Sequence, residues 1–335
     1  MTQHSSLIRD FLNPAFLPDK TKSVSLAQTH ISMVFIGDEF VYKIKKPVNF
    51  GFLDFSTLHK RKYYCHKEVK LNQRLSQEIY LGVLPIVYDG AHYRMKEGKE
   101  GIVEYAVKMR RIPHEVLMKS LFERGELSNE HLKKISNRLV LFHSNALTSP
   151  KIDRFGQPER FKVNTDENFQ QIKRYIGITI DEHDFKALKK WTKLFYETNK
   201  ALFLKRISDG KVRDCHGDLH MEHICFTESL SIIDCIEFND RFRYSDTVAD
   251  MAFLLMDLEY HGGWRFAEVL WDYYQEEARE EDIESLVHFY KVYRAVVRGK
   301  VNSFQVDDNT IEPRKKEQAI TSAKKYFQLA CSYIN

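Results

Sequence analysis

The sequence predicts an α+β protein of two lobes, a small antiparallel β-rich N-terminal lobe and a larger, mostly helical C-terminal lobe. Before about residue 110, apolar residues fall in short β-branched or aromatic segments separated by turns, as in hairpin-connected strands. After Arg111-Ile112-Pro113 they recur at steps of three and four, the period of amphipathic helices. We therefore divide the chain into residues 1–110 and 111–335.

The first lobe should contain one helix among its strands. Strands are expected at 24–29, 31–36 and 39–44, with Gly37-Asp38 as the turn of a hairpin. The charged, turn-free stretch 58–75 predicts a helix. Three further strands are expected at 84–87, 91–95 and 102–109.

The second lobe should be built from helices. Five apolar residues at helical spacing predict the first of them: Leu132, Ile135, Leu139, Phe142 and Ala146. Other helices are expected near 185–202, 247–258, 264–278, 283–304 and 317–333. A strand pair at 224–226 and 231–236 interrupts them.

Composition excludes several classes of protein. The 335 residues carry a net charge of +4, which is too near balance to indicate a nucleic-acid-binding protein. The basic stretch 60–70 is more simply explained as the solvated face of a helix. We expect no secretory signal, because residues 1–6 lack a basic flank followed by an apolar stretch, and no run approaches the roughly 18 apolar residues that a membrane span needs. Five cysteines, an odd number, favour a reduced protein. We expect a cytoplasmic protein that binds neither membrane nor nucleic acid.

One stretch carries most of the chemistry: Cys215-His216-Gly217-Asp218-Leu219-His220-Met221-Glu222-His223, followed by Ile232-Ile233-Asp234. Phosphoryl transfer needs one carboxylate to orient the acceptor hydroxyl and two ligands that hold Mg²⁺ on the phosphates. Asp218 is the candidate catalytic base, and Asp234 and His223 are the candidate metal ligands. Because Mg²⁺ prefers oxygen ligands, an imidazole at 223 favours Mn²⁺ or leaves the second metal position weak.

A nucleotide also needs cations and donors around its phosphates. Lys43 at the end of a strand is the candidate phosphate lysine, with Glu68 on the following helix as its partner. Lys45 is the rival, because it shares the strand face of Lys43. Ser32 in the turn 29–32 is a candidate phosphate contact. The strand ending at Met109 leads into the lobe junction, where backbone groups can contact adenine.

The His-Gly-Asp-Leu-His run with Ile-Ile-Asp resembles the aminoglycoside phosphotransferase-like kinases, distant relatives of protein kinases. Segments 29–32, 42–50, 51–55, 234–239 and 245–246 resemble an uncharacterised bacterial branch, the "aminoglycoside phosphotransferase family enzyme" group. In that family the fifth residue after the catalytic Asp is normally Asn, where this chain has His223.

The resemblance implies a bilobal protein-kinase-like fold with a nucleotide-binding N-lobe. It also implies ATP, Mg²⁺ and transfer of the γ-phosphate to a hydroxyl of an unidentified small molecule or protein. By the same likeness His216 and Asp250 support the catalytic loop. Some members of the branch resemble fusions to a P-loop kinase, and we expect the stand-alone form here.

Two other interpretations stay open. A non-catalytic nucleotide-binding pseudokinase would explain His223 and the absence of a glycine-rich phosphate loop. A zinc site would use five residues near the motif: Cys215, His216, His220, His223 and Cys225. The acids that follow Asp234 favour a cationic or polyhydroxyl acceptor, although Asp246 is expected to be a helix N-cap.

Overall fold

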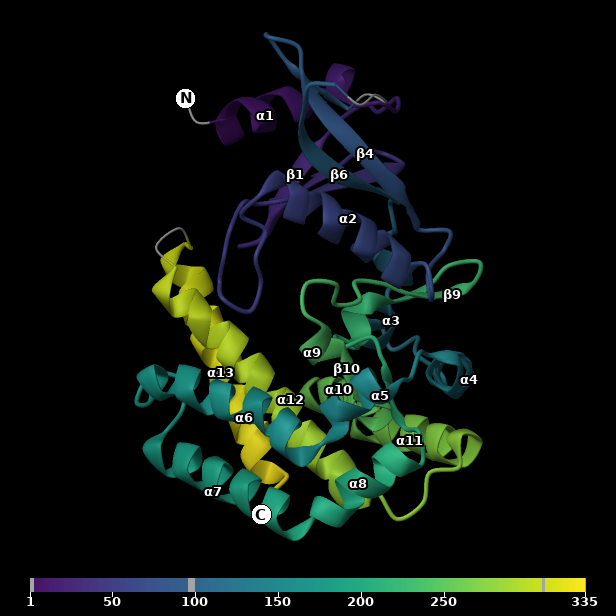
Figure 1. The fold of residues 1–335 in the computed structure, drawn as a ribbon, viewed down its shortest axis with the longest axis vertical. Helices are drawn as coiled ribbons and strands as arrows, with labels where there is room; N and C mark the ends of the chain where they lie inside the picture. The colour runs from purple at the N-terminus through teal and green to yellow at the C-terminus, as the bar shows by residue number, and fades with distance from the viewer. Residues whose placement is uncertain (1–2, 96–99, 309–310, 335) are drawn as a thin grey trace. The chain divides into compact units, whose positions relative to one another are not determined.

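The computed structural model describes residues 3–95, 100–308 and 311–334 (Figure 1). It divides into two compact units. The first comprises Met1–Gly125 and Glu222–Asp240, and the second comprises Glu126–Met221 and Arg241–Asn335. The α+β class with an antiparallel sheet, predicted from the sequence, is confirmed. The lobe boundary at residue 110 stays a prediction.

The first unit is built on a six-stranded sheet of order β1-β2-β3-β6-β4-β5, in which every neighbouring pair is antiparallel. Its strands are β1 (Ser25–Gln28), β2 (Ser32–Ile36), β3 (Phe40–Lys45), β4 (Tyr80–Tyr88), β5 (Tyr93–Met95) and β6 (Ile102–Arg110). The hairpin predicted at Gly37-Asp38 joins β2 to β3, and Gly37 N–H donates to the Phe40 carbonyl over 2.9 Å.

Two helices cover opposite faces of this sheet (Figure 1). Helix α1 (Gln3–Phe11) contributes Leu7 and Phe11 to a core with Tyr42 and Ile44 of β3. Helix α2 (Leu58–Asn72), which Thr57 caps, packs Cys65 and Val69 against β4 and β6. Because side chains alternate along a strand, Lys43 and Lys45 of β3 lie on the α2 face.

Three shorter elements complete the first unit. They are α3 (Met118–Glu123), β8 (Ile224–Phe226) and β9 (Leu230–Ile232). Strands β8 and β9 form a hairpin, and β9 is joined to the loop after α2 by the hydrogen bond from Ile232 N–H to the Leu75 carbonyl. This hairpin sets the course of the segment from Ile233 to Asp240.

The second unit is a helical assembly that includes one short strand pair (Figure 1). Its helices are α4 (Asn129–Asn145), α5 (Pro150–Asp153), α6 (Pro158–Ile172), α7 (Glu182–Thr198), α8 (Lys200–Ser208), α9 (Asp240–Arg243), α10 (Thr247–Tyr260), α11 (Trp264–Ala278), α12 (Glu284–Phe304) and α13 (Pro313–Ser332). The strand pair is β7 (Val212–Asp214) with β10 (Tyr244–Asp246).

Helix α10 lies at the centre of the second unit and is buried from Thr247 to Glu259. Its Phe253 and Met256 belong to the same core as Val296 of α12 and Phe327 of α13. Asp246 caps α10, as predicted, by accepting the Val248 N–H over 3.0 Å. A buried central helix gives a rigid support to the loop that follows β7.

Candidate functional site

In the first unit, the predicted phosphate lysine contacts two carboxylates, one from α2 and one from the segment after β9. Lys43 Nζ is 2.9 Å from Glu68 Oε1 on α2 and 2.8 Å from Asp234 Oδ1, which follows β9. This confirms the contact predicted between Lys43 and Glu68. Burial opposes the charge on Lys43, but attraction to Asp234 and Glu68 prevails and raises its pKa well above the ordinary value. The side chain is therefore a cation at neutral pH.

Lys45, the rival, also contacts Glu68 but is differently placed. Its Nζ donates to Glu68 Oε2 over 2.6 Å and to Glu237 Oε1. Only 1% of its side chain is exposed, against 17% for Lys43. Because solvent barely reaches Lys45, Lys43 is the lysine that a ligand can reach. The pairing of Lys45 with Glu237 was not predicted from the sequence. The spacing of two residues between Lys43 and Lys45 did indicate that both lysines could reach the same partner, which is Glu68.

Asp234 occupies an unusual backbone position. Its φ is 60°, in the left-handed region that non-glycine residues rarely adopt. Neighbouring groups hold it there, because its N–H donates to the Tyr80 hydroxyl over 3.2 Å and Cys235 N–H donates to Asn72 Oδ1 over 2.8 Å. The side chain is 45% exposed, and its Oδ2 lies 3.7 Å from His223 Nε2. The two predicted metal ligands are thus neighbours within one unit.

The two remaining nucleotide candidates lie in the same sheet. Ser32 faces Lys45 directly in the β2–β3 ladder, so both side chains lie on the α2 face. Its hydroxyl is buried without a hydrogen-bond partner among the described residues. Met109 pairs with Val41 and Tyr80 in the β6 ladders and packs against the α2-side core. Their nucleotide contacts stay predictions.

In the second unit, the loop after β7 is held by a buried carboxylate of α10. Asp250 accepts the His216 N–H over 2.6 Å on one oxygen and the Gly217 N–H over 2.9 Å on the other. Gly217 has φ 88°, which favours glycine, and its carbonyl accepts from Arg294 of α12 over 2.9 Å. Asp218 N–H then donates to His216 Nδ1 over 3.3 Å, and 34% of the Asp218 side chain is exposed. The loop therefore presents Asp218 from a fixed backbone.

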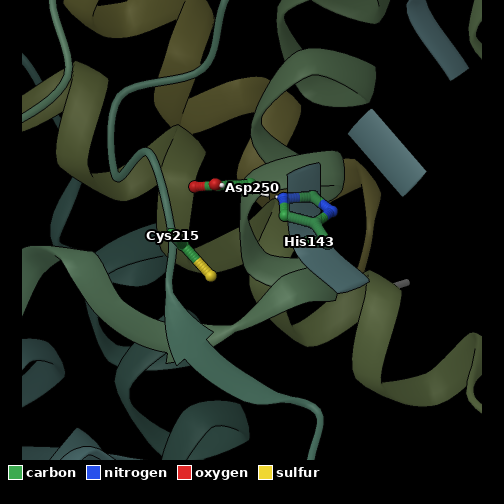
Figure 2. A group of neighbouring side chains, drawn as sticks. All are labelled: His143, Cys215 and Asp250. Carbon is green, nitrogen blue, oxygen red and sulfur yellow. Dashed lines mark hydrogen bonds and ion pairs between the residues drawn. The ribbon is translucent and has the colours of Figure 1, made fainter. Parts of the chain in front are cut away.

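Asp250 also belongs to a group of three side chains whose ligand atoms lie within 4.8 Å of one another: His143, Cys215 and Asp250 (Figure 2). Each already has a partner in the protein. His143 lies 2.8 Å from the Tyr274 hydroxyl and 3.4 Å from Asp250, and Cys215 Sγ lies 3.3 Å from the Ser245 carbonyl. We therefore assign this group a structural role and no metal.

The zinc interpretation loses support from the cysteines. Burial raises the pKa of the Cys225 thiol to about 12, which makes the thiolate that zinc binds more costly to form. The acids expected to attract a cationic acceptor also have partners: Glu237 pairs with Lys45, Asp240 with Lys67, and Asp246 with Arg206. That interpretation of the acceptor is not supported by their contacts.

Residues 52–284 match the model of a family described as the phosphotransferase enzyme family. An uncharacterised protein of Mycobacterium tuberculosis is 28% identical over 312 residues, 93% of this chain. The chain spans 60% of the length of that relative.

Two solved structures have a similar fold. A choline/ethanolamine kinase family protein from Mesorhizobium loti has a TM-score of 0.51 at 12% identity, over 100% of this chain and 99% of that one. Amicoumacin kinase hAmiN, in complex with AMP-PNP, Ca²⁺ and Ami, has a TM-score of 0.55 at 11% identity, over 98% of this chain and 94% of that one. Since the family model matches well over half of the sequence, this chain belongs to the phosphotransferase enzyme family.

Proposed function

We propose that this protein transfers the γ-phosphate of ATP to a hydroxyl group of a small molecule. One observation carries the proposal: Lys43 contacts both Glu68 and Asp234, which come from a helix and from the segment after β9. These are the residue types that kinase-like sites use to hold phosphates and a divalent cation. The fold neighbour solved with AMP-PNP and Ca²⁺ supports the same ligand classes.

The residues present fit a divalent cation. Asp234 offers a half-exposed carboxylate, and His223 offers an imidazole nitrogen 3.7 Å from it. We propose that these two hold Mg²⁺, with Mn²⁺ favoured by the nitrogen ligand. When bound, the cation supplies neutralisation of the phosphate charge. Lys43 adds a second positive charge to the phosphates, and Ser32 and the strand ending at Met109 are the proposed further nucleotide contacts.

Asp218 is the proposed catalytic base. The acceptor oxygen forms a bond to the γ-phosphorus, the bond from that phosphorus to the ADP oxygen breaks, and the hydroxyl proton passes to the Asp218 carboxylate. Asp250 and His216 would position Asp218 through the loop backbone, since their hydrogen bonds fix residues 216–218. The convergence of Asp218, Asp234 and His223 on one cleft stays a prediction.

The test is a transfer assay with labelled ATP over a panel of hydroxyl compounds. Asp218→Asn should lower turnover by several orders of magnitude while nucleotide affinity stays nearly unchanged, because this group acts on the acceptor. Asp234→Ala should abolish turnover. Full activity in Asp218→Asn would overturn the mechanism.

His223 favours one second candidate, a nucleotide-binding protein without transfer. It predicts that wild-type protein binds nucleotide and metal yet forms no phosphorylated product and hydrolyses no ATP with Mg²⁺ or Mn²⁺. The same assay, joined to a binding measurement, distinguishes the two candidates.

A further inference from the structure

Glu68 is shared by two lysines in unequal ways. Lys45 donates a hydrogen bond to Oε2 over 2.6 Å, whereas Oε1, 2.9 Å from Lys43, accepts no hydrogen bond from a described residue. The Lys43 contact is thus an ion pair without hydrogen-bond geometry. Lys43 can be drawn away to another anion at less cost than Lys45.

The ammonium group of Lys45 is buried, so it needs carboxylate partners that stay in contact with it. Its ammonium group lies 4.7 Å from the centre of the Phe55 ring, and 1% of its side chain is exposed. A buried ammonium is costly unless carboxylates surround it, and here Glu68 and Glu237 do so. Burial opposes its charge, but the attraction of these two acids prevails and raises the pKa of Lys45.

Glu237 stands three residues after Asp234 on the same segment, and it is 5% exposed. The left-handed backbone of Asp234 persists only where its surroundings hold it. Anchors of that segment include the N–H groups of Asp234 and Cys235 and the carboxylates of Asp234 and Glu237. Both carboxylates reach β3, where Asp234 contacts Lys43 and Glu237 contacts Lys45.

We propose that Lys45 and Glu237 form a latch, a positioning pair that keeps Asp234 in its metal-binding place when Lys43 turns from Asp234 to a nucleotide phosphate. The inference rests on the proposed function. Lys43 and Asp234 neutralise each other in the structure, and both must change partner when nucleotide and metal bind. Lys45 and Glu237 need no such change, so their contact holds the segment during the exchange.

The test measures Mn²⁺ binding by electron paramagnetic resonance in the presence of AMP-PNP. Glu237→Gln and Lys45→Met should each weaken Mn²⁺ binding at least tenfold, while AMP-PNP binding without metal changes less than twofold. Glu104→Gln is the matched control, because it breaks another buried ion pair of the first unit, that of Glu104 with Arg61, which contacts the Phe55 and Ser56 carbonyls. It should leave Mn²⁺ binding unchanged.

A double variant separates positioning from stability. Lys45→Met/Glu237→Leu replaces the pair by apolar groups and should regain thermal stability relative to the single variants, without regaining Mn²⁺ affinity. Recovery of both, or Mn²⁺ binding in Glu237→Gln equal to that in Glu104→Gln, would overturn the latch.

Failure of the proposed function gives a different result. If wild-type protein binds no Mn²⁺ with AMP-PNP, the proposed function fails. The latch is then tested by the rate of amide hydrogen exchange in the Asp234 segment. The Cys235 amide should exchange at least tenfold faster in Glu237→Gln and Lys45→Met than in Glu104→Gln, and equal rates would overturn the latch.

Discussion

Asp250 combines complete burial with three polar contacts, to two backbone N–H groups and to His143. Burial raises the pKa of a carboxyl group, but here the hydrogen bond and charge of His143, with the charges of His216 and Arg294, prevail and lower it from 3.8 to about 2. Since an ionised carboxylate only accepts hydrogen bonds, His143 Nε2 is the donor in its contact with Asp250.

This lowered pKa predicts an acid-sensitive contribution to stability. The contribution is complete above the ordinary pKa of 3.8 and is lost as the pH falls through about 2. Its size is about 2 kcal/mol, from roughly 1.4 kcal/mol per pKa unit. Asp250→Asn should therefore lower the free energy of unfolding by at least that much at pH 7, and the deficit should shrink between pH 4 and pH 2.

Denaturant titrations over this pH range test the contribution of Asp250, with Asp272→Asn as control because Asp272 is exposed on α11. The control should be nearly neutral throughout. A deficit in Asp250→Asn that does not vary with pH would contradict the assigned ionisation.

His223 gives the second residue-scale prediction. If the imidazole of His223 does no more than bind Mg²⁺ weakly, His223→Asn should raise Mg²⁺-dependent turnover. It should also lower the ratio of the Mn²⁺-dependent rate to the Mg²⁺-dependent rate. Steady-state rates at varied metal concentration measure both. A collapse of activity with either metal would show that His223 has another role near Asp234.

At the scale of the elements, α12 packs against α13 at a glycine. A Cβ added to Gly299 would lie 2.7 Å from two ring carbons of Phe327, which is closer than such atoms approach in proteins. Gly299→Ala should thus destabilise the second unit by about 1–3 kcal/mol, despite the better helix propensity of alanine. The control is Val301→Ala on the same helix, where the side chain is 45% exposed. Thermal unfolding measures both, and equal melting temperatures would contradict the close packing.

The sequence predicted strongly periodic elements well and weakly patterned ones poorly. Helix α11 and strand β8 have the predicted bounds, because each begins and ends where the apolar pattern does. The strand predicted at 231–236 ends at Ile232, since Asp234 takes a left-handed conformation that no propensity indicates. Helix α6 was not predicted at all. Its buried Asn164, Thr165 and Asn168 break the apolar pattern by which a helix is recognised.

The candidate site residues divide in the same way. Asp218, Asp234 and Lys43 follow from motif order, because each stands at a fixed distance from a recognisable strand or glycine. Asn72, Tyr80 and Arg294 do not, since each acts through one hydrogen bond made possible only by folding. No local pattern marks such residues.

For the molecule as a whole, the proposed function predicts that its ligands stabilise the folded protein. In the described part of the chain no helix is long and apolar enough to cross a membrane. A ligand that binds the folded protein alone stabilises it by RT ln(1 + [L]/Kd), about 2.7 kcal/mol at a hundredfold excess over Kd. ATP with Mg²⁺ should therefore raise the melting temperature.

Single variants should show which residues are responsible for the stabilisation by ATP and which for the stabilisation by Mg²⁺. Lys43→Met should lose most of the shift with ATP alone, because a phosphate-facing cation is removed. Asp234→Ala should keep that shift but lose the increment that Mg²⁺ adds. Asp218→Asn should keep both, since the acceptor base contacts neither the nucleotide nor the cation in the proposed mechanism. Differential scanning fluorimetry with ATP, Mg²⁺ and both together measures the three cases. A loss of the Mg²⁺ increment in Asp218→Asn equal to that in Asp234→Ala would move Asp218 from the acceptor to the metal and contradict its assignment as the base.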